Sequence, residues 1–148
     1  SLTELYRELA TYPVKGAYVF LDACFSGGYK SAAPLLAQKG VRVVPKVGLP
    51  QGKTLSFSSS SGDQTSSVYH DKKQGYYTYF LIKTIKDARG DLSMKDLFER
   101  TSAAVKKATA MIGKMQEPQC MVSPTWFGWE SLRLETPVEP APVAPQGE

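Results

Sequence analysis

The hydrophobic positions at the start of the chain repeat with the period of a helix. The apolar residues that share one helical face are Leu2, Leu5, Tyr6 and Leu9. Ser1 and Glu4 have the spacing of a capping box, which predicts that the helix begins at once. Pro13 is expected to end it, because proline cannot continue a helix without losing a hydrogen bond.

Two later segments have the patterns of strands. Residues 17–21, Ala-Tyr-Val-Phe-Leu, form a continuous apolar run that is typical of a strand buried on both faces. Residues 54–58, Thr-Leu-Ser-Phe-Ser, alternate and predict a second strand. Between them we expect a helix at 31–38, a short strand at 41–44, and a loop at 45–53 that Pro and Gly interrupt.

The second half of the chain is predicted to be mainly helical. Residues 59–75 are polar and rich in turn formers, and helices are expected at about 76–88 and 93–111. Ser93 with Asp96 can cap the second of these helices. The residues near one stripe of that helix are Leu92, Leu97, Val105 and Ile112.

Strands that alternate with helices predict an α/β fold with a mainly parallel sheet. A last strand is expected near residues 131–134. The buried type of strand at 17–21 needs a neighbour on each side, so we expect part of the fold to lie outside this chain. Residues 1–135 are therefore interpreted as part of one domain, and the proline-rich residues 136–148 as a linker or tail.

Composition narrows the classes of partner. The 148 residues suit about one domain, and the net charge of +4 comes from scattered Lys and Arg. No basic stripe is interleaved with aromatic residues, so we expect no nucleic-acid partner. No run approaches the roughly 20 apolar residues of a membrane-spanning helix, so no membrane partner is expected either. The first residue is Ser rather than Met, which we interpret as a processing site or a domain boundary.

Two cysteines, Cys24 and Cys120, do not make a disulfide framework. With one histidine in the chain, a zinc site of the usual Cys/His spacing is not available, and we expect no metal or cofactor.

Cys24 is the candidate for chemistry, because active residues of open α/β sheets lie at the carboxyl ends of strands. Gly27 and Gly28 follow it and let the backbone turn sharply. A thiol there can attack an acyl carbon while its own N–H helps to hold the oxyanion. The alternative is a buried structural cysteine, which is common in proteins.

Two other cysteine chemistries fit less well. Residues 24–30 nearly spell a phosphatase loop, but Lys30 stands where arginine is needed for a bidentate phosphate clamp. A redox pair is weaker still, because no second cysteine stands two residues away.

Asp22 stands two residues before Cys24, and side chains two apart on an extended segment point the same way. Asp22 and Cys24 can therefore face one pocket. A carboxylate in such a pocket would suit a basic side chain of a substrate, although its negative charge would oppose formation of the Cys24 thiolate. The alternative is that Asp22 caps the next turn.

Four motifs, in order, resemble the caspase family, and specifically its metacaspase and bacterial caspase-like branch. They are Val-Phe-Leu-Asp-Ala-Cys-Phe-Ser-Gly-Gly at 19–28, Ser-Phe-Ser-Ser-Ser-Ser-Gly-Asp-Gln-Thr-Ser at 56–66, Gly-Tyr-Tyr-Thr-Tyr-Phe-Leu at 75–81 and Gln-Glu-Pro-Gln at 116–119. Together they cover about residues 14–120. The resemblance implies the C-terminal, nucleophile-bearing part of a caspase-like three-layer fold, with helices on both faces of the sheet.

The resemblance also implies roles for particular residues. Cys24 would be the nucleophile, and its N–H would be half of an oxyanion hole beside Gly27 and Gly28. Asp22 would be the base of a pocket that accepts Arg or Lys, and the strand with Ser56 and Ser58 would line the substrate cleft.

This sequence departs from the family at the general base. The family's histidine lies roughly 50 residues before the cysteine, whereas only 23 residues precede Cys24. His70 is the sole histidine and is interpreted as a surface loop residue. The base must then come from an upstream segment, or the protein is inactive. No carboxylate occurs in residues 29–36, so the calcium dependence of many metacaspases is not supported.

Two functions follow from this sequence. The first is a cysteine endopeptidase that cleaves after Arg or Lys through a thioester and takes its base from the upstream half of the same domain. Its partners would be protein or peptide substrates with a basic residue before the cut. We also expect autoprocessing in the loop 38–53, which carries several basic residues. The alternative is an inactive caspase-like interaction or regulatory module.

Overall fold

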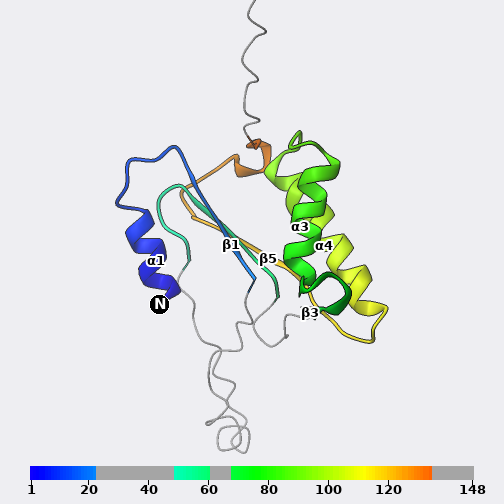
Figure 1. The fold of residues 1–148 in the computed structure, drawn as a ribbon. Helices are drawn as coiled ribbons and strands as arrows, with labels where there is room; N and C mark the ends of the chain where they lie inside the picture. The colour runs from blue at the N-terminus through cyan, green and yellow to red at the C-terminus, as the bar shows by residue number, and fades with distance from the viewer. Residues whose placement is uncertain (23–48, 61–67, 135–148) are drawn as a thin grey trace, which may run out of the picture.

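The computed structural model describes residues 1–22, 49–60 and 68–134. The helix expected at 31–38, the strand expected at 41–44 and the tail at 136–148 lie outside the described residues. Figure 1 shows the described elements as a small sheet with helices on either side of it.

The first helix, α1 (Leu2–Leu9), confirms the predicted start. Ser1 is its N-cap, and both hydrogen bonds of the capping box with Glu4 are present. Tyr6 is the buried residue of this helix, with none of its surface exposed, whereas Leu5 is 42% exposed. The helix ends at Leu9, before Pro13 is reached.

The described sheet has three strands in the order β1 (Ala17–Leu21), β2 (Thr54–Ser58) and β5 (Gln119–Val122). β1 and β2 are parallel, as expected, and Ala17 is paired with Thr54. β2 and β5 are antiparallel. The sheet of the described residues is therefore mixed rather than mainly parallel.

The expected strand at 131–134 is wrong. Residues Trp129–Ser131 form a short 3-10 helix, η2, after Gly128, whose φ of 78° turns the chain. Beyond η2, Arg133 makes only an isolated β-bridge to Ser93 at the start of the last long helix. The last strand of the sheet is β5, which comes earlier in the chain.

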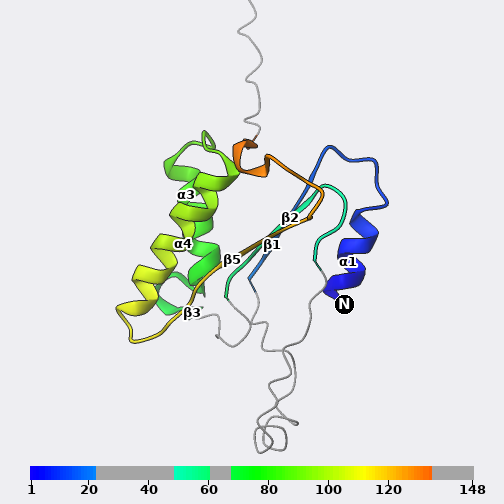
Figure 2. The same ribbon diagram turned by 180° about the vertical axis from the view of Figure 1, so that it is seen from behind.

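The burial of the strands also differs from the expectation. All five residues of β2 are buried, because β2 has a strand on each side and the helices cover both faces of the sheet (Figures 1 and 2). β1 is an edge strand among the described strands, and Tyr18 and Phe20 are each 39% exposed. Burial of β1 on both faces is therefore not seen within the described residues.

Part of the segment expected to be irregular forms a small hairpin. β3 (Val68–Tyr69) pairs with β4 (Gln74–Gly75), and the 3-10 helix η1 (His70–Lys72) joins them. His70 thus lies in the connection of a hairpin, in agreement with its interpretation as a loop residue.

Helices α3 (Tyr76–Asp87) and α4 (Met94–Ala110) confirm the two predicted helices. Ser93 caps α4 by accepting a hydrogen bond from the backbone N–H of Asp96 at 3.1 Å. Of the predicted stripe, Leu92, Leu97 and Val105 are buried, but Ile112 is 48% exposed because the helix ends before it.

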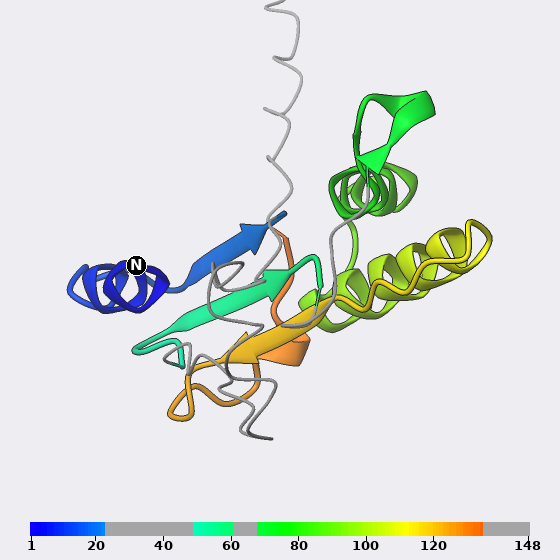
Figure 3. The same ribbon diagram turned by 90° about the horizontal axis from the view of Figure 1, so that it is seen from below.

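The helices cover both faces of the sheet. α1 lies on one face, and α3 with α4 lies on the other, as Figures 1 and 2 show from opposite sides. Figure 3 shows the same separation from below. The main core lies between the sheet and α3 and α4, where the ring of Phe57 is 5.1 Å from that of Phe98. None of the described helices is long and apolar enough to span a bilayer.

Candidate active site

The carboxyl ends of β1 and β2 meet at one edge of the sheet, because the two strands are parallel. The backbone N–H of Ser59 donates to the carbonyl oxygen of Leu21 at 2.9 Å and joins the two ends. Asp22 follows β1 at this edge. Cys24, Gly27 and Gly28 lie outside the described residues.

Asp22 is exposed, and its carboxylate contacts the start of α3. Its Oδ2 accepts hydrogen bonds from the backbone N–H of Thr78 at 3.3 Å and from the Thr78 hydroxyl at 2.5 Å. The N-cap of α3 is Gly75, which has no side chain to provide a cap. Asp22 therefore caps α3 from 56 positions away in the sequence. The turn that follows Asp22 along the chain lies outside the described residues.

A carboxylate at this position is favourable for a physical reason. The first backbone N–H groups of a helix have no partner within the helix, and they carry a partial positive charge. The first turn of α3 contains no acidic residue of its own. The negative charge of Asp22 therefore stabilises the first turn of α3, and the helix holds the carboxylate at the end of β1.

Gly75 allows the carboxylate to lie this close to the helix. A Cβ atom built on Gly75 would lie 2.3 Å from Asp22 Oδ2 and 3.0 Å from its Cγ. The backbone of Gly75 has an ordinary extended conformation, with a φ of −65°. Glycine is thus needed here for space and not for an unusual backbone angle.

Tyr77, next to Thr78, is buried close enough to Asp22 for the charge of its carboxylate to act on it. It is 2% exposed, and its hydroxyl has no hydrogen-bond partner among the described residues. Burial raises the pKa of Tyr77 above its ordinary value, and the negative charge of Asp22 raises it further. Tyr77 therefore stays neutral and contributes a packed ring rather than a charge.

Cys120 has the properties of a structural cysteine. It lies on β5 opposite Phe57 and packs against the main core. Burial, followed by the charge of Glu130, raises the pKa of the Cys120 thiol to about 12. A thiol that stays protonated at neutral pH is a poor nucleophile, so Cys120 is not a candidate nucleophile.

Ser56 and Ser58 are buried, with 0% and 3% of their surfaces exposed. The Ser56 hydroxyl accepts a hydrogen bond from the hydroxyl of Tyr6 at 2.7 Å, which joins β2 to α1. Since successive strand side chains alternate between faces, Ser58 belongs to the same face. The observed role of Ser56 is in packing, and substrate binding by these two serines stays a prediction.

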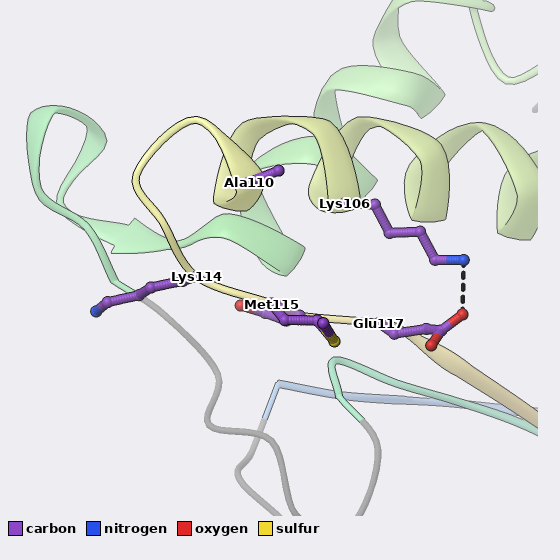
Figure 4. A pocket seen from close by; sticks show the side chains of 6 residues that line it. Lys106, Ala110, Lys114, Met115 and Glu117 are labelled. Carbon is purple, nitrogen blue, oxygen red and sulfur yellow. Dashed lines mark ion pairs between the residues drawn. The ribbon is translucent and has the colours of Figure 1, made fainter.

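Gln116 connects the segment before β5 to the same edge of the sheet. It is 1% exposed, and its Nε2 donates to the carbonyl oxygen of Ser59 at 2.9 Å. Gln116 also lines a surface hollow of about 310 Å³, and Figure 4 shows the side chains around that hollow. The hollow is lined by Lys106, Ala110, Lys114, Met115, Gln116 and Glu117. Lys106 and Glu117 form an ion pair of 2.6 Å across it.

Sequence reasoning found Asp22 but missed Thr78 and Gly75, which hold its carboxylate. The signal for both was present in the motif Gly-Tyr-Tyr-Thr at 75–78. The motif by itself does not show which distant side chain contacts the start of the helix. Within the described residues, no group of three or more His, Cys, Asp or Glu side chains could hold a metal ion.

Comparison with known proteins gives one family. The chain matches the family described as Caspase domain over residues 2–125, which include both strands of the candidate site and helices α3 and α4. No curated protein matched the sequence. The matched residues make up more than half of the chain, so this protein belongs to the Caspase domain family, and membership of that family suggests a cysteine peptidase.

Proposed function

We propose that this chain is the nucleophile-bearing part of a cysteine endopeptidase of the metacaspase and bacterial caspase-like branch. It cleaves peptide bonds after Arg or Lys, with Cys24 as the nucleophile and Asp22 as the acidic group that binds the basic side chain. The general base is a histidine supplied by an upstream segment of the same domain.

The observation that carries this proposal is the carboxylate of Asp22. It is exposed at the carboxyl end of β1, and its hydrogen bonds to Thr78 fix it there. Two peptide units separate Asp22 from Cys24, so their Cα atoms are at most about 7 Å apart. A fixed negative charge at that range suits a cationic side chain next to the bond that is cut.

The reaction begins when the upstream histidine takes the proton of the Cys24 thiol and the thiolate attacks the carbonyl carbon of the substrate. The carbonyl oxygen becomes an oxyanion that accepts a hydrogen bond from the Cys24 N–H. The tetrahedral intermediate collapses, the C–N bond breaks, and the amine leaves with a proton from the upstream histidine. Water then hydrolyses the thioester, releases the acid and restores the thiol.

Autoprocessing follows from the same specificity. The loop 38–53 ends at Lys53, which is exposed, and exposed loops are favoured sites of cleavage. An enzyme that cuts after Arg or Lys would find suitable residues there, and the Cys24→Ala variant of the same protein should stay intact.

Fluorogenic peptides that differ only in the residue before the cut test this function in the full-length protein. We expect cleavage after Arg and Lys, no cleavage after Asp, and no activity in Cys24→Ala. Asp22→Asn keeps an oxygen acceptor for Thr78 but removes the charge. It should lower kcat/KM for basic substrates by roughly 10- to 100-fold, since hydrogen bonds to charged groups are worth about 1.5–3 kcal/mol.

Asp96→Asn is the matched control, because Asp96 is also an exposed carboxylate at the start of a helix, in the first turn of α4. It should leave kcat/KM unchanged. A preference for Asp before the cut, or full activity of Asp22→Asn on basic substrates, would refute the assignment of Asp22. A full-length protein that cleaves none of the peptides would favour the inactive interaction module instead.

A further inference from the structure

We propose that Thr78 is a positioning residue for substrate binding, which holds the Asp22 carboxylate so that Oδ1 is the oxygen presented to the basic side chain. This inference rests on the proposed function, since it assigns a task to the carboxylate of the same site. It adds a residue from α3, more than fifty positions away, to the specificity of the enzyme.

The two oxygens of the Asp22 carboxylate differ in the number of hydrogen bonds that they accept. A carboxylate oxygen has about two lone-pair positions. Both donors of Thr78, its N–H and its hydroxyl, bind Oδ2. Oδ2 is therefore filled by the protein, whereas no described residue donates to Oδ1. A cationic side chain that reaches Asp22 would meet Oδ1.

The two hydrogen-bond donors of Thr78 also fix the orientation of the Asp22 carboxylate. One hydrogen bond allows a carboxylate to rotate about the bonded atom, but two donors on the same oxygen restrict it. The donors are themselves held in place, because Thr78 belongs to the first turn of α3 and the neighbouring Tyr76 and Tyr77 are buried in the core. The rigid start of a packed helix thus determines the direction of an exposed side chain.

The backbone of Gly75 limits the space that is available to the Asp22 carboxylate. The carboxylate lies against the backbone of Gly75, with all three of its non-hydrogen atoms within 3.1 Å of where a Cβ would be. The backbone restricts the carboxylate on that side, and Thr78 binds it on another. Gly75 and Thr78, which belong to the same motif at 75–78, therefore both restrict the side chain of Asp22.

The test compares Thr78→Val, which removes the hydroxyl with little change in shape, with Thr78→Ser, which keeps it. We expect Thr78→Val to raise KM for peptides with Arg or Lys before the cut roughly threefold to tenfold, with kcat changed less than twofold. This rise in KM is smaller than the loss of a hydrogen bond to a buried charged group would give, because Asp22 is exposed and the backbone N–H of Thr78 still donates to it. Thr78→Ser should restore the KM of the unsubstituted protein.

Thr84→Val is the matched control, since Thr84 lies on the same helix and its hydroxyl bonds only to the Phe80 carbonyl within the helix. It should leave KM unchanged. Gly75→Ala is an independent variant that should also raise KM, because its Cβ would displace the carboxylate. In a Cys24→Ala background, the same changes should weaken binding of an Arg-containing peptide, as measured by fluorescence anisotropy.

The double variant Asp22→Asn with Thr78→Val separates this proposal from a direct contact of Thr78 with substrate. If Thr78 acts through Asp22, its loss should have little further effect once the charge is gone. An unchanged KM in folded Thr78→Val and Gly75→Ala proteins would overturn the positioning role while leaving the proposed function intact. If instead the unsubstituted protein cleaves no basic substrate, the proposed function itself fails.

Discussion

At the scale of single residues, the two cysteines are predicted to differ sharply in reactivity. The pKa of Cys120 is raised to about 12 by burial and by Glu130, and only the thiolate reacts with alkylating reagents. In native full-length protein at pH 7.5, iodoacetamide should label Cys24 at least tenfold faster than Cys120. Mass spectrometry of the two cysteine-containing peptides over time measures both rates.

Two variants and one denatured sample serve as controls for this labelling. Cys120→Ala should leave the fast phase intact, and Cys24→Ala should remove it. In denaturant, where burial is lost, the two thiols should react at comparable rates. Equal rates in the native protein would argue against Cys24 as the attacking group, because they would mean that the site does not activate its thiol.

The distant partner of Asp22 could not be predicted from the sequence. The period of two along a strand predicts that Asp22 and Cys24 point the same way, with a pocket role or a cap as the alternatives for Asp22; the direction of Cys24 stays a prediction, because Cys24 lies outside the described residues. The structure describes a cap of another helix, formed by Thr78. A contact between positions 22 and 78 depends on how β1 and α3 pack, which no local rule contains.

At the scale of elements, long periodic segments and their caps were predictable. The capping box of α1 and the Ser93 cap of α4 rest on bonds within three or four residues, which the sequence specifies directly. β5 was missed because Gln-Cys-Met-Val at 119–122 is only four residues long and does not alternate. It forms a strand because β2 offers it an edge, which is a property of the sheet.

The hydrogen bond between Tyr6 and Ser56 is predicted to hold α1 on its face of the sheet. Both residues are fully buried, and the bond joins positions 50 apart. Tyr6→Phe leaves Ser56 without this donor, and Ser56→Ala leaves the Tyr6 hydroxyl buried without this acceptor. Each should lower the free energy of unfolding by about 1–3 kcal/mol.

A double-mutant cycle with urea unfolding measures the contact itself. The double variant should be less destabilised than the sum of the two single variants, because the second change removes a polar group that the first left unsatisfied. Tyr12→Phe is a suitable control, since Tyr12 follows the same helix but is 58% exposed. Strict additivity would mean that the bond contributes nothing beyond the packing of each side chain.

At the scale of the whole molecule, the contacts that join the described layers converge on β2. α1 binds β2 through Tyr6, β1 is joined to β2 at Leu21 and Ser59, and Gln116 joins the approach to β5 to the same strand end. These contacts gather at β2, whose five residues are all buried. The fold thus supports the candidate site from a central strand, while α3 reaches it through Asp22.

The last prediction concerns the stability of this packed core at alkaline pH. The pKa of Cys120 is raised from 9.0 to about 12, and burial also raises those of Tyr6 and Tyr77 above 10.0. Below about pH 8 these groups are protonated in both states, and their contribution is fully present. As the pH rises further, the unfolded chain loses protons that the folded chain keeps, so the free energy of unfolding falls.

Urea midpoints of the full-length protein between pH 7 and 12 should therefore be constant to about pH 8 and then decrease. Cys120→Ser should reduce the decrease between pH 8 and 10, because a serine hydroxyl does not titrate there. Tyr77→Phe should reduce the decrease in the urea midpoint above pH 10. This variant should also be well tolerated, since it removes a buried hydroxyl that has no partner among the described residues. A midpoint that stays level to pH 12 would show that these three groups are no harder to ionise in the folded protein than in the unfolded chain. The buried environments described for Cys120, Tyr6 and Tyr77 would then be wrong.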